Sequence, residues 1–266
     1  AHCGGDMTRS DKTALITGAS AGLGTEFARL FAKGGHDVVL VARRRDKLET
    51  LATVLSKAHG INATVIAADL TDPKSPQRIA DKLAVAGTDI DFLVNNAGFG
   101  TNGAFAELDG VRELDLLEVN IKALVGLTHL FLPGMIERGY GKVLNIGSTA
   151  GFQPGPFMAD YYASKAFVIS FTEAIAQELR GTGVTATVAC PGATTTEFAD
   201  TAGVDESMLF KMRVADAPSV AEDAYRAMMS GKAKTIPGIF NRVTAEFSRI
   251  GPTSLTSRLS ARLNKS

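Results

Sequence analysis

Short runs of apolar and β-branched residues alternate along this chain with longer segments whose apolar positions follow a helical pattern. The short runs are apolar throughout, which is typical of strands buried on both faces of a parallel sheet. Six strands are therefore predicted, at 13–17, 37–42, 64–68, 92–95, 142–146 and 185–190. Helices are predicted at 23–33, 44–59, 75–86, 111–138, 160–180 and 220–230. This alternation indicates an α/β fold with helices on both faces of the sheet.

The same pattern indicates how the chain is divided. No linker or internal repeat interrupts the alternation, so residues 10–266 are expected to form a single domain. Residues 1–9 are expected to be a disordered terminus that includes the remnant of an expression tag before Met7. Residues 194–217 mix apolar, small and charged side chains, which predicts a lid.

A last segment, 239–263, again places apolar residues at helical spacing. It holds a single acid, Glu246, and the cations in and just after it are Arg242, Arg249, Arg258, Arg262 and Lys265. We interpret it as a helical extension that packs on the domain or on a second subunit. A basic amphipathic surface that contacts a membrane with anionic lipid, or an acyl carrier, is the alternative.

Composition excludes several classes of protein. The 266 residues carry 28 basic and 28 acidic side chains, so the net positive charge that nucleic-acid binding usually needs is missing. Two cysteines, Cys3 and Cys190, and four scattered histidines provide neither a disulfide framework nor the spacing of metal ligands. An apolar run of about 18 residues and a signal peptide are also missing. A cytoplasmic setting and a small-molecule partner are therefore expected.

A glycine-rich turn follows the first predicted strand, where nucleotide-binding α/β folds hold a pyrophosphate. Glycine permits a tight turn and close approach of the backbone, and the free amides of the following helix would face the phosphates. The candidate residues are Gly18, Ser20, Ala21, Gly22, Leu23 and Gly24. Tight packing of strand on helix is the alternative explanation for the glycines.

The end of the second strand indicates which dinucleotide is bound. Arg43 and Arg44 stand where an NAD-dependent enzyme would place an acid for the ribose hydroxyls. A guanidinium group suits the extra phosphate of NADP(H), so NADP(H) is favoured over NAD(H). Asp69 and Leu70 close the third strand, and Asp69 would either accept a hydrogen bond from the adenine amino group or simply shape a turn.

A tyrosine and a lysine provide the candidate proton-transfer chemistry. Tyr161 and Lys165 are four residues apart in a predicted helix, so they share a face, and the cation would favour the phenolate. Ser148 precedes Tyr161 by thirteen residues. Tyr162 competes for the same role, because a three-residue step would also bring it to Lys165.

Taken together, these motifs resemble the short-chain dehydrogenase/reductase family from Thr17 to about Gly238. The resemblance rests on the glycine-rich turn, Asp69, the Asn-Asn-Ala-Gly sequence at 95–98, Asn120, Ser148, Tyr161-x3-Lys165 and Pro191-Gly192. It implies a doubly wound Rossmann sheet with strand order 3-2-1-4-5-6-7 and a seventh strand near 234–236. It also implies a homodimer or homotetramer, built through the helices at 111–138 and 160–180.

The resemblance implies a role for each site residue. Tyr161 would be the acid in carbonyl reduction and the base in alcohol oxidation, and Ser148 would hold the substrate oxygen. Lys165 would lower the pKa of Tyr161 and bind the nicotinamide ribose, and Asn120 would anchor a water that relays protons to Lys165. Further cofactor contacts would come from Asn96, Ala97, Gly98, Pro191, Gly192, Thr194 and Thr196.

Two departures from the family pattern affect cofactor contacts but leave the hydride chemistry untouched. Ser20 and Ala21 stand where many NADP-dependent relatives carry a basic residue, so phosphate binding would rest on Arg43, with Ser20 and Arg44 assisting. Threonines follow Pro191-Gly192, where relatives often carry a β-branched aliphatic residue.

The expected walls of the substrate cleft are mostly apolar, which favours an uncharged, hydrophobic ketone or alcohol. They are Phe99, Ser148, Phe152, Met158, Phe198 and Met208. Similar members of the family suggest lipid-like, steroid, aromatic or 3-oxoacyl substrates. A nucleotide-sensing regulator that keeps the fold without catalysis is the rival function, and the complete set of Asn120, Ser148, Tyr161 and Lys165 argues against it.

Overall fold

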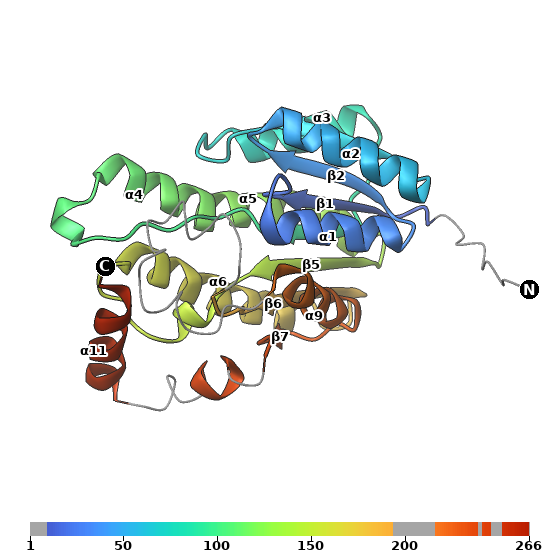
Figure 1. Cartoon of the computed structure of the whole chain (residues 1–266). Helices are drawn as coiled ribbons and strands as arrows, with labels where there is room; N and C mark the ends of the chain where they lie inside the picture. Colours follow the sequence, from blue (N-terminus) through green and yellow to red (C-terminus); the bar gives the residue numbers. More distant parts are fainter. Residues whose placement is uncertain (1–9, 194–215, 239–240, 246–251, 266) are drawn as a thin grey trace, which may run out of the picture.

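The apolar runs form seven parallel strands, and the computed structural model describes residues 10–193, 216–238, 241–245 and 252–265. Hydrogen bonds join the strands in the order β3-β2-β1-β4-β5-β6-β7, as the family resemblance implies (Figure 1). The strands are β1 (Thr13–Thr17), β2 (Asp37–Ala42), β3 (Ala63–Ala67), β4 (Phe92–Asn95), β5 (Gly141–Ile146), β6 (Val184–Ala189) and β7 (Lys234–Thr235). Each predicted strand agrees with these bounds to within one residue.

Both faces of the sheet are covered, which explains why the strands are apolar throughout. In β1, Ile16 belongs to one buried cluster and its neighbour Leu15 to another, because consecutive side chains point to opposite faces. The first cluster is completed by α1 (Gly22–Lys33), α2 (Arg45–His59) and α9 (Ala217–Met229). The second is completed by α3 (Ser75–Val85), α5 (Leu124–Glu137) and α6 (Ala159–Glu178).

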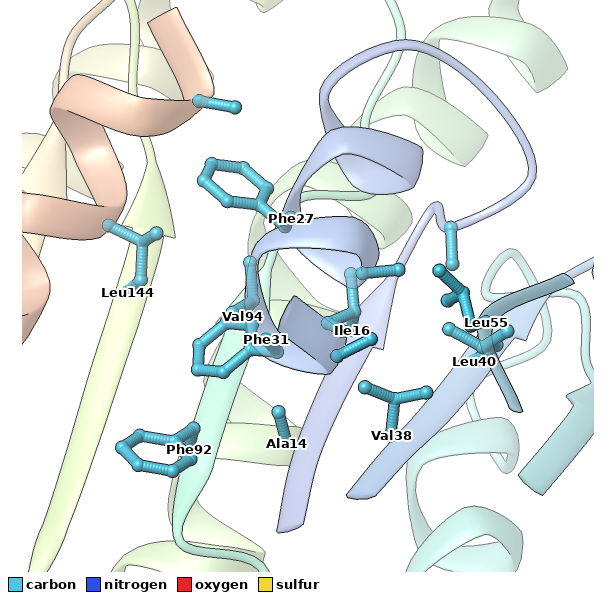
Figure 2. Close-up of a cluster of buried hydrophobic side chains, with 14 of the residues drawn as sticks. Ala14, Ile16, Phe27, Phe31, Val38, Leu40, Leu55, Phe92, Val94 and Leu144 are labelled. Atoms are coloured by element: carbon cyan, nitrogen blue, oxygen red, sulfur yellow. The ribbon is translucent and has the colours of Figure 1, made fainter. Parts of the chain in front are cut away.

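Two phenylalanines of α1 fix this helix on the first face. Figure 2 shows Phe27 and Phe31 on the side of α1 that faces the sheet, with Phe31 beside Phe92 of β4. All three side chains are fully buried, and the ring centroids of Phe31 and Phe92 are 5.1 Å apart. Replacing a buried phenylalanine with alanine costs about 3–5 kcal/mol. This packing therefore also holds the turn between β1 and α1 against the sheet.

The helix predicted at 111–138 is a continuous stretch with a wider turn inside it. It consists of α4 (Gly110–Leu117), the π-helical segment η2 (Glu118–Ala123) and α5. The stretch Gly110–Glu137 is long and apolar enough to cross a membrane by length and composition, since an 18-residue window within it has a mean hydropathy of 1.4. A core helix passes the same test, and here Leu116 and Leu127 are buried in the fold.

Three further elements are short or terminal: η1 (Phe105–Glu107), η3 (Thr149–Phe152) and α11 (Thr253–Asn264). Residues 241–245 are also helical. Figure 1 shows α11 at the same end of the molecule as α4. Most of the predicted lid lies outside the described residues, whereas its last residue, Ala217, is instead the first residue of α9. Also outside the described residues are the predicted terminus 1–9 and the site residues Thr194, Thr196, Phe198 and Met208.

Helix α11 packs on the domain by an unexpected face. Thr256 and Ser260 are buried, while Leu255 and Leu259 are each 55% exposed. These two leucines therefore do not pack on the domain, and the alternatives of a second subunit, a membrane or an acyl carrier stay predictions for them. Polar side chains take their place because the surface beneath α11 offers hydrogen-bond partners.

Candidate active site

The glycine-rich turn joins β1 to α1 at the edge of the sheet where the parallel strands end. Gly18 has a φ of +67°, and a Cβ there would lie 2.8 Å from Asn96 Nδ2. A Cβ at Gly24 would lie 2.2 Å from the carbonyl oxygen of Gly18, so neither position accepts a side chain. Helix α1 has no side-chain cap and no acid in its first turn. Its first N–H groups can therefore face the phosphates of a dinucleotide.

The two arginines after β2 lie differently. Arg44 is half-buried, and its Nη2 donates a hydrogen bond to the Ser20 hydroxyl at 3.2 Å, on the glycine-rich turn. Arg43 is exposed. Of the two arginines predicted to bind the cofactor, Arg44 is thus the one that contacts the glycine-rich turn. A guanidinium held there fits the extra phosphate of NADP(H).

Asn96 ties the end of β4 to the end of β1. Its Nδ2 donates to the carbonyl oxygen of Thr17 at 2.9 Å. The Thr17 hydroxyl accepts the backbone N–H groups of Asn96 and Ala97, both at 3.0 Å. These bonds place the predicted cofactor residues Asn96, Ala97 and Gly98 against the glycine-rich turn. Asp69, in turn, accepts a hydrogen bond from the Thr71 N–H, as the turn interpretation of this residue requires.

Asn120 lies in the wide turn η2 and is only 1% exposed. Its Oδ1 accepts the Phe99 N–H at 3.1 Å, and its Nδ2 donates to the Phe99 carbonyl at 3.0 Å and to Ser164 Oγ at 3.1 Å. A Cβ at Gly98 would come within 2.9 Å of Asn120 Oδ1 and 3.6 Å of Lys165 Nζ. The space between Asn120 and Lys165 therefore exists only because residue 98 is glycine.

Ser148, Tyr161 and Lys165 converge at the end of β5. Ser148 caps η3 by accepting the Ala150 N–H at 3.1 Å, and its side chain is also hydrogen-bonded to Tyr161. Lys165 is 6% exposed, donates to the Ile146 carbonyl at 2.8 Å and has its Nζ 5.7 Å from the centre of the Tyr161 ring. Ser148 thus caps η3 and also lies at the predicted catalytic position.

The protonation of this group differs from the expectation. Burial raises the pKa of Tyr161 to about 12, although its hydrogen bond with Ser148 acts in the opposite direction. Burial lowers the pKa of Lys165 to about 8. The net direction is therefore opposite to the expected lowering of the Tyr161 pKa, because burial is the largest cause; the effect predicted for Lys165 stays a prediction. At neutral pH Tyr161 keeps its proton.

The neighbouring Tyr162 has a different environment. It is 4% exposed, and its hydroxyl donates to Asn264 Oδ1 at 3.1 Å. Its ring meets the Tyr161 ring edge-on, with centroids 6.1 Å apart. Since the Tyr162 hydroxyl is engaged by the C-terminal helix, Tyr161 is the better candidate for proton transfer.

Three further residues belong to this site although no sequence motif marked them. Ser164 is fully buried and links Asn120 to the Tyr161 carbonyl, to which it donates at 2.7 Å. Asn241 has its Oδ1 2.6 Å from the place of a Cβ at Gly192, next to Pro191. Glu113 is buried and accepts a hydrogen bond from Thr101 at 3.0 Å. Burial raises the pKa of Glu113, and Asp160, the residue before Tyr161, raises it further.

The predicted substrate walls within the described residues lie around this centre. Phe99 is held by Asn120, and the Arg112 guanidinium lies 5.3 Å from the centre of its ring. Phe152 ends η3 and packs on the buried cluster of Val168 and Ile236. Met158 is 3% exposed, so it supports the wall from behind.

Comparison with known proteins adds to this geometry. The family model described as short chain dehydrogenase matches residues 12–207. Sulfoacetaldehyde reductase 2 of Chromohalobacter salexigens is 41% identical over 186 residues, 69% of this chain and 73% of that protein. Ketoacyl reductase HetN of a Nostoc strain is 40% identical over 185 residues, 70% of this chain and 64% of that protein. A solved short-chain dehydrogenase from Sphingobium yanoikuyae in complex with NADPH has a TM-score of 0.81 at 33% identity, covering 88% of this chain and 92% of that one.

Proposed function

The chain belongs to the short-chain dehydrogenase family of oxidoreductases, and we propose that it is an NADP(H)-dependent ketoreductase acting on a hydrophobic ketone or secondary alcohol. The observation that carries this proposal is the convergence of Ser148, Tyr161 and Lys165 beside Asn120. These are the residue types that hold a carbonyl oxygen and deliver a proton to it.

The protonation of Tyr161 supports the direction of reduction. When bound, NADPH supplies the hydride that adds to the carbonyl carbon. The oxygen then gains charge, and the Tyr161 hydroxyl gives it a proton while the Ser148 hydroxyl donates a hydrogen bond to it. With a pKa of about 12 Tyr161 is protonated at neutral pH, which suits an acid better than a base. Proton return to the tyrosine would pass along Lys165, with Asn120 anchoring a water.

The cofactor preference rests on the arginines beside the glycine-rich turn. Arg44 reaches the turn through Ser20, and Arg43 lies next to it in the sequence. Positions 43 and 44 hold arginines rather than a carboxylate that would repel a phosphate, so we propose NADP(H) over NAD(H). The solved relative in complex with NADPH is consistent with this preference.

The substrate class follows from the walls of the cleft. One relative is named for a ketoacyl substrate and another for a small sulfonated aldehyde, so the names by themselves do not decide the class. The rings of Phe99 and Phe152 favour an apolar substrate, of the lipid-like, steroid, aromatic or 3-oxoacyl kind.

A substrate screen by NADPH consumption tests the proposal. Bulky apolar ketones and a 3-oxoacyl thioester are expected to give a kcat/KM at least about tenfold above that of sulfoacetaldehyde. Tyr161→Phe should abolish turnover while NADPH still binds, and the matched control Tyr162→Phe should keep its kcat. A preference for sulfoacetaldehyde would reject the substrate class. Tight NADPH binding without turnover of any carbonyl would favour a regulatory protein.

The association of the chain is a separate part of the proposal. We propose that the chain is cytoplasmic and forms a homodimer or homotetramer. The association is supported by apolar side chains that α4 and α6 leave exposed: Val111 at 69%, Leu114 at 68% and Phe167 at 40%. Light scattering of the full chain tests it, and Leu114→Asp should shift the mass toward the monomer.

The outer face of α11 supports a contact with an anionic surface. Leu255 and Leu259 are exposed beside Arg258 and Arg262, which is the pattern of helices that lie on anionic lipid. Flotation with anionic vesicles should retain the full chain but not a chain ending at Gly238. Equal recovery of both would leave an acyl carrier as the partner to test by the same pair of chains.

A further inference from the structure

Helix α11 buries three polar side chains at one-turn spacing, and two of them, Ser260 and Asn264, form hydrogen bonds with the rest of the domain. Thr256, Ser260 and Asn264 are 4%, 0% and 1% exposed, in a helix whose leucines 255 and 259 face outward. Buried polar groups require partners of defined geometry, whereas apolar contacts tolerate sliding. This attachment therefore fixes the position of α11 as well as its burial.

Asn264 is the most connected of the three residues. Its Oδ1 accepts from the Tyr162 hydroxyl at 3.1 Å, and its Nδ2 donates to the Pro156 carbonyl at 3.1 Å. Its own carbonyl accepts from Asn102 Nδ2 at 2.8 Å. A carbonyl can only accept, so Pro156 determines which side of the amide faces it. The side chain thus joins α6 to the segment after η3, and the backbone carbonyl of the same residue holds the segment after β4.

The two segments that Asn264 joins are those that flank the substrate side of the site. The segment after β4 carries Phe99, and the segment after η3 leads from Phe152 to Met158. They also contact each other directly, since the Gly103 N–H donates to the Phe157 carbonyl at 2.9 Å. Phe157 has a φ of +68°, a conformation that a non-glycine residue keeps only where its surroundings enforce it.

Tyr162 transmits the same constraint to the catalytic tyrosine. A Cβ at Gly155 would lie 2.1 Å from Tyr162 Cγ, so the segment after η3 runs directly across this ring. The Tyr162 ring also meets the Tyr161 ring edge-on. Asn264 holds the Tyr162 hydroxyl, and the ring held in this way is close to both Gly155 and Tyr161.

We propose that Asn264 is a positioning residue that fixes both substrate-side segments and thereby determines the KM for bulky ketones. The inference rests on the proposed ketone reduction. Asn264 acts through Tyr162 and the two segments, and the binding of NADPH at the opposite part of the site does not involve it.

Steady-state kinetics of Asn264→Leu test the proposal, since leucine has a similar size but no hydrogen-bonding group. The KM for a bulky apolar ketone should rise about tenfold, the effect of leaving buried partners unpaired. The KM for NADPH and the kcat for a small ketone should stay within about twofold. Leu259→Ala, on the exposed face of the same helix, is the matched control and should change none of these. The KM for the bulky ketone should be no higher in the double variant Asn264→Leu, Tyr162→Phe than in Asn264→Leu alone.

Two results would overturn the proposal. A lower Tm with an unchanged ratio of KM values for bulky and small ketones would make Asn264 a mere anchor of the C-terminus. An equal rise of the KM for NADPH would show that Asn264 affects the whole site and not the substrate-side segments alone.

Hydrogen exchange separates this inference from the proposed function, because it needs no turnover. The Gly103 amide should exchange faster in Asn264→Leu than in Leu259→Ala, as its bond to Phe157 loosens. If the wild type reduced no ketone, the proposed function would fail, and unchanged exchange at Gly103 would then reject the positioning role as well.

Discussion

Replacing Gly155 with alanine measures how closely the segment after η3 fits Tyr162. The added Cβ would lie 2.1 Å from Tyr162 Cγ and 2.3 Å from both Cδ atoms. Non-bonded carbon atoms pack at about 3.5–4.0 Å, so the ring or the segment would have to move by more than about 1 Å. The ring has little room, because Tyr162 is 4% exposed and its hydroxyl is bonded to Asn264.

The expected cost has two parts. Overpacking of this kind costs about 1–3 kcal/mol, and loss of the hydroxyl hydrogen bond adds about 1 kcal/mol. We therefore expect Gly155→Ala to lower the free energy of unfolding by about 2–4 kcal/mol, which is a fall in Tm of about 5–15 °C for a chain of this size. Urea unfolding followed by circular dichroism measures the change.

A double-mutant cycle with Tyr162→Ala identifies the source of the cost. Without the ring there is no clash, so Gly155→Ala should be within about 0.5 kcal/mol of neutral in that background. Gly110→Ala is the matched control, since a Cβ there meets nothing within 4 Å and alanine is the better helix former. The same cost for Gly155→Ala in both backgrounds would refute the reasoning and assign the effect to the backbone of the segment.

Three further predictions follow from the charges of the site. Because burial raises the pKa of Glu113, the folded state holds its proton more tightly, and stability should fall as the pH rises above the ordinary value of 4.5. Glu113→Gln should remove that part of the fall, and parallel pH curves of the two proteins would contradict this. Arg44→Ala should raise the KM for NADPH at least about tenfold relative to that for NADH, by loss of charged hydrogen bonds. Arg43→Ala is the comparison, and an unchanged ratio in both variants would remove the arginines from cofactor selection. Ketone reduction should decline above about pH 8, where Lys165 loses its proton, since its pKa is about 8 and that of Tyr161 is about 12. A rate that stays constant to about pH 10 would reject this assignment.

The sheet could be predicted because each strand has its own local signal. Runs such as Leu15 and Ile16 are apolar on both sides of the backbone, which only a doubly covered strand requires. The order of the strands came from the family resemblance, since apolar periodicity carries no information on which strand lies beside which. The motif residues Asn120, Ser148, Tyr161 and Lys165 lie together because their spacing follows that of the family.

Other features depend on contacts that no local pattern records. Tyr162 and Asn264 meet across 102 positions of sequence, so their bond exists only once α11 is in place. The leucines of α11 suggested an apolar attachment, yet the surface beneath the helix offers Gln153, whose Nε2 donates to Ser260 Oγ at 2.8 Å. The pKa of Tyr161 was expected from one neighbour, whereas burial by the whole fold decides it.

The wide turn η2 makes the length of this segment as constrained as its residues. A π turn holds one residue more than an α turn, so deleting one residue between 118 and 123 would let α4 and α5 join as a regular helix. The flanking helices would keep their phase, because the wide turn accommodates its extra residue locally, but the residues inside the turn would shift around the axis. Asn120, which lies inside the turn, would then lose its place against Phe99, its hydrogen-bond partner. Active relatives should therefore differ freely in the residues on the outer side of this segment. Its length should stay constant, because an insertion or deletion there would abolish activity.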